Sequence, residues 1–400
     1  MPWNVVDKEQ RKREFIETML HRKVSIAAVC RAHHISRECG HKWWRRFKDG
    51  GPAGLKERSR QSRAAVQLQA RWRKRCEGLR RRFPCWGAMA LRAVLRSSYP
   101  RERLPAVATI GRWLAQAQLV RPRARRLPGP ILPRERWRVA RRPNDVWTLD
   151  FKGWFRTADG ARVEPLTVRD LASRYILAVE HVTPLSDRAV RPILLRLFRR
   201  FGLPRTIHVD NGGPFGGGGA LGLSTLSVWW LRLGIEVEFS RPARPGDNAA
   251  HEQMHGILKN ETARPAAANR AAQLRRFDRF RRRYNHLRPH RALRLRTPAS
   301  RYYPSSRSLP RVLPQWHYPE HWSLLQPGGG GRVWWLGRPR VIGRAFAHER
   351  LGLAPQPEGI VSVYLGPHLI GRLHPADPAG MRPARRSGPL LKKAHLFRPS

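Results

Sequence analysis

Three carboxylates lie at points of the chain from which they could converge on one site. Asp150 belongs to the apolar run 146–151, Asp210 directly follows the β-type run 206–209, and Glu252 lies near the start of a helical pattern. Two strand ends and one helix can bring such side chains to one edge of a sheet. Carboxylate oxygens are the ligands that Mg²⁺ and Mn²⁺ prefer. Two such ions about 3.5–4 Å apart support in-line displacement at a phosphodiester. The pattern predicts two divalent ions (Mg²⁺ or Mn²⁺) held by Asp150, Asp210 and Glu252.

Each carboxylate also has an ordinary structural explanation. Asp210 begins an Asp-Asn-Gly sequence, which is common in turns. Glu252 could be a first-turn acid that interacts favourably with the helix dipole. Asp150 is harder to explain in this way, because a carboxylate in an apolar strand is costly without a partner. The three carboxylates occur together, on two strands and a helix in this order along the chain, and this combination favours a functional site.

Three polar residues accompany Glu252. Asn248 lies one turn before it and could cap the helix or orient a substrate. His255 and Lys259 follow Glu252 by three and seven residues, which places them on the same helix face. Lys259 is the best candidate for a phosphate contact, although a solvated surface lysine fits the pattern about as well.

The elements that must position these residues lie between 143 and 304. Three strands are expected in sequence, followed by alternating helices and strands and then by two helices. The expected strands are 146–151, 162–168, 175–182, 206–209 and 235–239, and the expected helices are 187–201, 226–233, about 247–262 and about 270–285. This order predicts an α/β fold, a mixed five-stranded sheet with helices on its faces.

Two helical units are expected before this core. In residues 1–60, Ser25 and Ser36 can cap two helices that are joined by a short turn, as in a helix-turn-helix. The second helix carries the cations that we expect to contact DNA: Arg37, Lys42, Arg45 and Arg46. An ordinary amphipathic surface helix would show much the same pattern.

Residues 61–120 repeat the theme with helical segments at about 66–82, 86–98 and 106–118. Thr109 and Arg112 in the last segment form a second candidate DNA-reading element, in a unit resembling a winged helix. Residues 121–142 contain nine Arg and several Pro, which is typical of a basic linker. Short β runs at 331–336, 340–342, 360–365 and 369–373, separated by Gly and Pro, predict a small β-barrel over 314–374. Residues 375–400 are expected to form a basic tail.

The charge balance identifies the class of partner. The chain has 400 residues with 79 Lys+Arg against 28 Asp+Glu, a net charge of +51. Nucleic acid is the natural counterpart of such a charge, ahead of an anionic membrane surface. A hydrophobic content of 41% and 15 Trp indicate folded domains. There is no apolar run of about 18 residues, so we expect no membrane association and a cytoplasmic, nucleoid-associated protein.

The four cysteines form no Cys-x-x-Cys pair. A structural zinc site needs paired ligands at short spacing, and Cys30 with the nearby His33 and His34 provides only one such group. We therefore expect reduced, mostly buried thiols and no zinc site.

Several motifs resemble those of a known family. The segments are 147–155 (WTLDFKGWF), 210–215 (DNGGPF), 223–230 (LSTLSVWW), 244–252 (RPGDNAAHE) and 284–290 (YNHLRPH), with 1–3, 35–37 and 51–55 near the N-terminus. They resemble the DDE transposases and retroviral-type integrases, and most closely the IS481-like insertion-sequence transposases. The resemblance extends over most of the chain. Ala249 and Gln253 depart from the usual Gly and Arg of that pattern.

The resemblance implies a ribonuclease-H-like integrase core with Asp150, Asp210 and Glu252 as its catalytic, metal-binding triad. It also implies a reaction: hydrolysis of a phosphodiester at the transposon end, then attack of the released 3′-hydroxyl on target DNA. A homo-multimer on DNA is expected, because two ends must be brought together.

Two other functions fit the same residues. One is a catalytically inactive, decayed transposase that acts only as a DNA-binding protein. The other is a ribonuclease-H-type nuclease that cuts RNA–DNA hybrids, which the DNA-reading units and the barrel disfavour.

Overall fold

The structure is a computed structural model that describes residues 8–21, 24–56, 63–120, 140–240 and 249–385. Asn248, most of the basic linker and the end of the basic tail lie outside these residues. The chain divides into two compact units, residues 1–72 and 73–400, and each is described by itself.

The first unit is a small helical bundle. It contains α1 (Lys8–His21), α2 (Ile26–Ala32), α3 (Arg37–Gly50) and the 3₁₀ turn η1 (Gly51–Leu55). These elements enclose a core of Phe15, Ile16, Val29, Cys30, Trp43 and Leu55. The expected helix-turn-helix is confirmed, with α2 and α3 as its two helices.

The sequence explains how α2 and α3 begin and pack. The Ser36 hydroxyl accepts a hydrogen bond from the Cys39 backbone N–H at 3.2 Å and so caps α3. Ser25 stands at the same position of α2, but its side chain makes no capping bond. At Gly40, a Cβ would lie 2.2 Å from Cys30 Sγ, so only glycine allows the two helices to approach so closely.

Three more helices follow. They are α4 (Arg63–Arg82), α5 (Ala88–Ser98) and α6 (Val107–Gln116), close to the expected segments. Leu91 and Leu95 of α5 and Ile110 and Leu114 of α6 are buried. None of the helices in the described part of the chain is long and apolar enough to cross a membrane.

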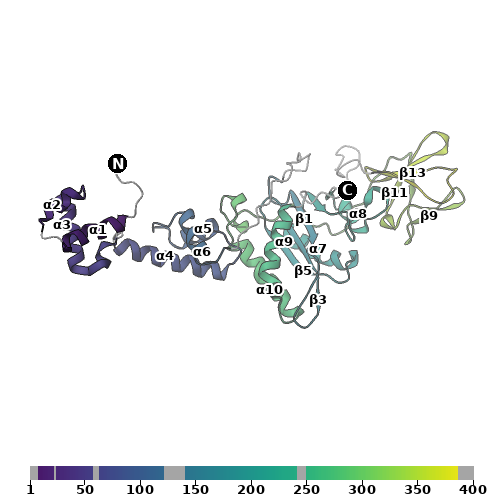
Figure 1. Ribbon diagram of the computed structural model, residues 1–400. Helices are drawn as coiled ribbons and strands as arrows, with labels where there is room; N and C mark the ends of the chain where they lie inside the picture. The colour runs from purple at the N-terminus through teal and green to yellow at the C-terminus, as the bar shows by residue number, and fades with distance from the viewer. Residues whose placement is uncertain (1–7, 22–23, 57–62, 121–139, 241–248, 386–400) are drawn as a thin grey trace. The chain divides into compact units, whose positions relative to one another are not determined.

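The centre of the second unit is a mixed five-stranded sheet in the order β5-β4-β1-β6-β7 (Figure 1). Strand β1 pairs antiparallel with β4 and parallel with β6, while β4–β5 is antiparallel and β6–β7 parallel. The strands are β1 (Val146–Phe151), β4 (Pro165–Asp170), β5 (Ile176–His181), β6 (Thr206–Val209) and β7 (Glu236–Phe239). The expected mixed sheet is confirmed.

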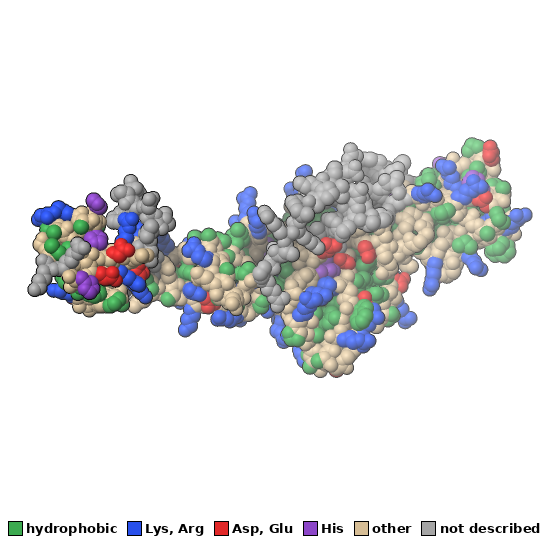
Figure 2. Space-filling view, in the orientation of Figure 1, with side chains coloured by type: hydrophobic (Ala, Val, Ile, Leu, Met, Phe, Trp, Pro, Cys, Tyr) green, Lys and Arg blue, Asp and Glu red, His purple; other side chains and the backbone are tan. Residues whose placement is uncertain are grey.

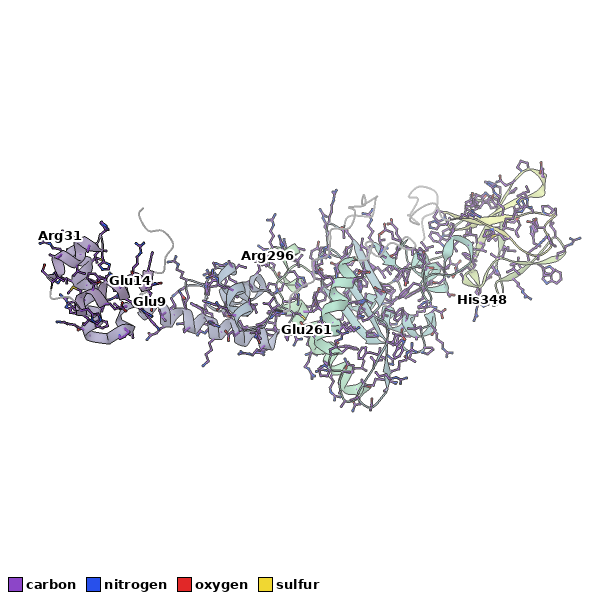
Figure 3. All side chains as sticks on the ribbon, viewed as in Figure 1. Glu9, Glu14, Arg31, Glu261, Arg296 and His348 are labelled. Atoms are coloured by element: carbon purple, nitrogen blue, oxygen red, sulfur yellow. The ribbon has the colours of Figure 1, made fainter. Side chains whose placement is uncertain are left out.

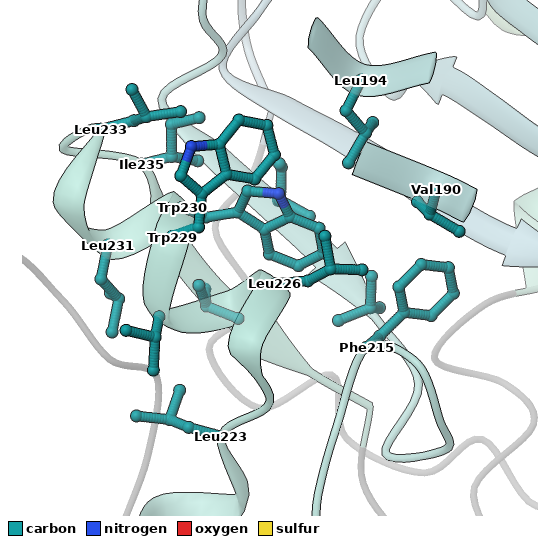
Figure 4. Close-up of a cluster of buried hydrophobic side chains, with 14 of the residues drawn as sticks. Val190, Leu194, Phe215, Leu223, Leu226, Trp229, Trp230, Leu231, Leu233 and Ile235 are labelled. Atoms are coloured by element: carbon teal, nitrogen blue, oxygen red, sulfur yellow. The ribbon is translucent and has the colours of Figure 1, made fainter. Parts of the chain in front are cut away.

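Helices cover both faces of this sheet. On one face, α7 (Asp187–Phe201) and α8 (Thr225–Arg232) pack against Trp147 and Leu149 of β1. Figure 4 shows buried side chains of these two helices, among them Leu194 and Trp230. On the other face, α9 (Ala249–Thr262) and α10 (Arg270–His286) pack against Ile176 and Val179 of β5. Successive strand residues point to opposite faces. Thr148 and Asp150 therefore point to the face that carries α9.

A short hairpin of β2 (Phe155–Arg156) and β3 (Arg162–Val163) lies between β1 and β4 in the chain. Beyond the core, the C-terminal region is rich in β-structure. It contains β8 (Ser323–Leu325), β9 (Arg332–Trp335), β10 (Arg338–Val341), β11 (Leu351–Pro355), β12 (Val361–Leu365), β13 (His368–Leu373) and β14 (Arg382–Pro383).

The C-terminal strands form one sheet in the order β14-β13-β12-β11-β8 and a separate β9–β10 hairpin. The runs expected from the sequence correspond to β9, β10, β12 and β13, whereas β8, β11 and β14 were not expected. The closure of these strands into a barrel stays a prediction, as do the domain boundaries.

Candidate active site

Asp150 and Asp210 occupy equivalent positions on neighbouring parallel strands. Thr148 of β1 pairs with His208 of β6, and each aspartate follows two residues later: Asp150 within β1 and Asp210 directly after the end of β6. Residues two apart on a strand share a face, and the carboxyl ends of parallel strands meet at one edge of the sheet. The Asp150 side chain is 20% exposed, and Asp210 is exposed. This edge therefore presents two carboxylates to solvent.

The turn after Asp210 is fixed to the neighbouring strand. The Asn211 side-chain amide donates a hydrogen bond to the backbone oxygen of Ser240 at 2.5 Å, just beyond β7. A Cβ on Gly212 would lie 3.3 Å from a carboxylate oxygen of Asp210, so glycine keeps space around that carboxylate.

Helix α9 is bound to the sheet beside Asp150 by two buried histidines. One ring nitrogen of His251, Nδ1, lies 2.8 Å from Thr148 Oγ1, and the other, Nε2, lies 2.5 Å from Thr167 Oγ1. His255 Nε2 lies 2.7 Å from the same Thr167 oxygen. His251 and His255 are 1% and 7% exposed. His255 thus faces the sheet rather than solvent, and its expected contact with DNA stays a prediction.

His255 also faces the Asp150 carboxylate, with 3.7 Å between His255 Nδ1 and Asp150 Oδ2. Burial lowers the pKa of His255 to about 3, and the nearby Lys152 and Arg169 act in the same direction. Burial also lowers the pKa of His251 well below its usual value. Both rings are therefore neutral near pH 7, and the His255–Asp150 contact is not an ion pair there.

Among the described residues, Asp150, His251 and His255 form a group whose possible metal-donor atoms all lie within 4.8 Å of one another. Both ring nitrogens of His251 are already hydrogen-bonded to threonine hydroxyls. The two histidines therefore act as part of a hydrogen-bond network next to Asp150 rather than as an open chelate.

Glu252 lies in the first turn of α9, directly after His251, and is exposed. Successive residues of a helix are about 100° apart around its axis. Because His251 and His255 face the sheet, Glu252 lies on a flank of α9, about 100° around the helix axis from His251. Glu261, labelled in Figure 3, lies at the opposite end of α9. It pairs with Arg283 and Arg288.

Two lysines lie near Asp150. Lys152 follows it by two residues, and burial and Lys259 of α9 lower the pKa of Lys152 while Asp150 raises it. Both lysines line a cavity of about 190 Å³, together with Trp154 and Leu258. Such a pair of ammonium groups suits a phosphate. Lys152 was not among the candidates from the sequence.

The remaining candidates lie on other elements. On α3, Arg37, Lys42 and Arg45 are exposed, while Arg46 is partly buried with its guanidinium 4.9 Å from the Trp43 ring centre. On α6, Arg112 is exposed and Thr109 partly buried. Asn248 lies outside the described residues. Figure 2 shows Lys and Arg side chains spread over the visible face, with acidic side chains fewer.

Thr148, Thr167 and His251 were missed by the sequence analysis, along with Lys152. The sequence did carry a signal for them: Thr148 and Asp150 alternate with apolar residues in β1, and His251 and His255 are four apart on one helix face. Neither signal identifies Thr167 as their shared partner.

Comparisons with known proteins find similar domains and relatives. Two integrase core domain models match residues 140–245 and 233–298, and a helix-turn-helix domain model matches residues 11–63. The chain is 29% identical over 291 residues to the insertion element IS476 uncharacterized 39.2 kDa protein of Xanthomonas euvesicatoria. That match covers 70% of this chain and 73% of the relative.

A second relative is the insertion element IS407 uncharacterized 31.7 kDa protein of Burkholderia multivorans. It is 27% identical over 191 residues, which is 48% of this chain and 66% of that protein.

Two solved structures are similar at lower identity. The HTLV-2 integrase catalytic core domain in complex with magnesium, in its dimeric form, is 16% identical with a TM-score of 0.32, covering 41% of this chain and 99% of that one. The simian T-cell lymphotropic virus intasome in complex with PP2A regulatory subunit B56 gamma is 14% identical with a TM-score of 0.37, covering 81% and 98%.

Proposed function

We propose that this chain is a DDE transposase that cleaves the ends of an insertion sequence and joins them to target DNA; its similarity to integrase core domain models and to two insertion-element proteins supports the proposal. In the first reaction, water hydrolyses a phosphodiester at the element's end and leaves a 3′-hydroxyl. In the second, that hydroxyl attacks a phosphodiester of target DNA, and the 3′-oxygen of the target strand leaves. Asp150, Asp210 and Glu252 are proposed as the catalytic triad.

The pairing of Thr148 with His208 is the observation that carries the proposal. This pairing supports a shared edge of the sheet for Asp150 and Asp210, and the contacts of His251 with Thr148 and Thr167 support a position of α9 beside β1. A cluster of carboxylates at the edge of a buried sheet is costly unless cations balance it.

The donor set fits divalent magnesium or manganese. Asp150 and Asp210 offer hard carboxylate oxygens beside solvent, as these ions require. Asp150, Asp210 and Glu252 would hold them, two being expected. When bound, the ions supply Lewis acidity at the scissile phosphate.

Other residues of the chain bind and orient the DNA in this proposal. Lys152 and Lys259 bind a backbone phosphate next to Asp150, and Asn248 orients the substrate. Arg37, Lys42, Arg45 and Arg46 on α3, with Thr109 and Arg112 on α6, bind the DNA outside the core. A homo-multimer on DNA follows from the need to pair two ends.

The test is cleavage of a labelled duplex that carries the element's terminus, in Mg²⁺ and in Mn²⁺. We expect metal-dependent release of a 3′-hydroxyl by the wild type and none by Glu252→Gln. Both proteins should bind the duplex equally, because the substitution removes a charge but keeps the shape of the side chain. Cleavage that survives in Glu252→Gln would rule out the assignment of Glu252.

Two further outcomes select the other functions. Tight, salt-sensitive binding of the duplex without a cut by the wild type would indicate an inactive DNA-binding protein. Ala249 and Gln253, which replace the usual Gly and Arg of the pattern, would then be candidates for the cause of the lost activity. Faster cleavage of an RNA–DNA hybrid than of duplex DNA would indicate a ribonuclease-H-type nuclease.

A further inference from the structure

We propose that Thr148, Thr167, His251 and His255 are positioning residues: a buried clamp of hydrogen bonds that sets the distance between Asp150 on β1 and Glu252 on α9. The inference deepens the proposed function and rests on it for its catalytic consequence. The clamp itself rests on contacts that do not depend on that function.

Thr167 is the centre of the clamp. It pairs with Asp150 across β1 and β4, and its side chain is fully buried. Its hydroxyl donates to the backbone oxygen of Asp150 at 3.0 Å and also lies within hydrogen-bond distance of both histidines. One oxygen atom therefore joins the strand that carries one carboxylate to the helix that carries another.

The hydrogen-bond capacities of these groups match. A threonine hydroxyl has one proton and two acceptor sites. If that of Thr167 donates to Asp150, it can accept the Nε2–H of both His251 and His255. His251 Nδ1 is then an acceptor for the Thr148 hydroxyl at 2.8 Å, a shorter contact than the 3.3 Å between that hydroxyl and the Arg169 backbone oxygen. The scheme needs neutral rings, in agreement with their burial, and it leaves His255 Nδ1 facing the Asp150 carboxylate without donating to it.

Packing alone does not require histidines here. Met254 and Leu258 of the same helix fill the apolar contact with the sheet and are each 1% exposed. Burying two imidazoles costs free energy unless their hydrogen bonds are made. Those bonds have defined lengths and directions, which an apolar contact lacks, so they fix α9 along the strand. Glu252, between the two histidines in the sequence, is fixed with them.

Thr167→Val and Thr167→Ser are the matched pair of variants that tests the clamp. Valine has nearly the same shape and suits a buried strand, but it removes the hydroxyl from all three contacts. Serine keeps the hydroxyl. The full-length chain is used for both, and Thr148→Val with Thr148→Ser provides a second pair should Thr167→Val fail to fold.

Three quantities are measured: the affinity for Mg²⁺ alone by calorimetry, kcat and KM for end cleavage, and hydrogen exchange of the α9 amides in metal-free protein. Loss of an outer partner of a metal ligand typically costs about 10–100-fold in affinity or activity. We expect losses of that size in Mg²⁺ affinity and kcat for Thr167→Val, with unchanged KM. The α9 amides should exchange faster in this variant. Thr167→Ser should stay close to the wild type in all three.

The inference is overturned if Thr167→Val matches the wild type in Mg²⁺ affinity and α9 exchange, or if Thr167→Ser is impaired as much as Thr167→Val. Failure of the proposed function looks different, because the wild type itself would then neither bind Mg²⁺ nor cut DNA. In that case the hydrogen exchange of α9 alone tests the clamp. Faster exchange in Thr167→Val but not in Thr167→Ser supports it, and equal exchange in the two variants overturns it.

Discussion

His290, in the loop after α10, shows how burial changes the chemistry of a single residue. Its ring centre lies 4.8 Å from that of Tyr284, and its Nε2 has no hydrogen-bond partner among the described residues. Burial lowers the pKa of His290 to about 3, with Arg288 and Arg169 acting in the same direction. The folded protein thus holds a neutral imidazole, whereas the unfolded chain binds a proton at a pKa near 6.5.

This shift predicts a loss of stability in mild acid. Because the pKa of His290 is lower in the folded state, only the unfolded state gains a proton as the pH falls from 6.5 toward 3. The contribution of His290 to the free energy of unfolding is therefore complete above pH 6.5 and declines below it. Between pH 7 and 5 the ideal linkage for one such group is about 2 kcal/mol, and partial solvent screening reduces it to about 1 kcal/mol.

His290→Phe keeps the ring contact with Tyr284 and removes the titration. Denaturant unfolding at pH 7 and pH 5 should therefore show a smaller fall in the free energy of unfolding for the variant, by about 1 kcal/mol. Equal falls in the two proteins would contradict the buried neutral state of His290.

At the same scale, the sequence predicted the positions of Asp150 and Asp210 but not their surroundings. A strand ending in an acid is visible in the sequence, and parallel pairing then brings two such ends to one edge. The role of Thr167 depends on which residue lies opposite Asp150 and on a helix that begins more than 80 residues later. No local pattern contains that register. For the same reason His255 was expected at the DNA surface, although it is buried against the sheet.

At the scale of elements, the two helices of the helix-turn-helix differ in how their first turns are held. Ser36→Ala removes the hydrogen bond to the Cys39 N–H and should lower the stability of the first unit by about 1 kcal/mol. Ser25→Ala is the matched control, because the Ser25 side chain makes no capping bond and its loss should cost clearly less.

Two measurements compare the stability of both variants with that of the wild type: thermal unfolding of the full chain, and hydrogen exchange of the α3 amides. An equal loss of stability in Ser25→Ala and Ser36→Ala would show that the Ser36 cap contributes nothing specific.

The strand β11 shows where local patterns fail at this scale. Its sequence contains Gly352 and ends in Pro355, residues that are typical of loops, and it was therefore expected to separate strands. A Cβ on Gly352 would lie 2.3 Å from the Tyr318 ring and 2.9 Å from that of Trp322. Glycine is needed for aromatic rings to lie flat on this strand. Packing against aromatic residues that are distant in the sequence therefore stabilises β11 as a strand, and local propensities do not contain that information.

At the scale of the molecule, a net charge of +51 makes salt the main variable of DNA binding. Each phosphate contact of a Lys or Arg contributes about −0.9 to the slope of log K against log salt. If Arg37, Lys42 and Arg45 each bind a phosphate, replacing all three by Ala should make the slope shallower by about 2.7. Titrations of a duplex at several salt concentrations give this slope.

The control removes the same charge elsewhere: Arg332, Arg338 and Arg372, three exposed residues of the C-terminal strands. We expect this triple variant to change the slope much less. Equal changes in the two triple variants would mean that total charge, rather than the face of α3, sets the affinity.

The first unit has a hydrophobic core of its own, whose last residue is Leu55, whereas Glu252 comes about 200 residues later. At about 5–20 residues per second, the ribosome needs roughly 10–40 s to make the intervening chain. During that interval the growing chain carries a folded helix-turn-helix and no complete triad. If the helix-turn-helix and the triad act as proposed, a nascent chain would bind DNA before it could cut it. A chain that terminates early, before Glu252, would compete with full-length copies for the same ends and so act as an inhibitor made from the same message.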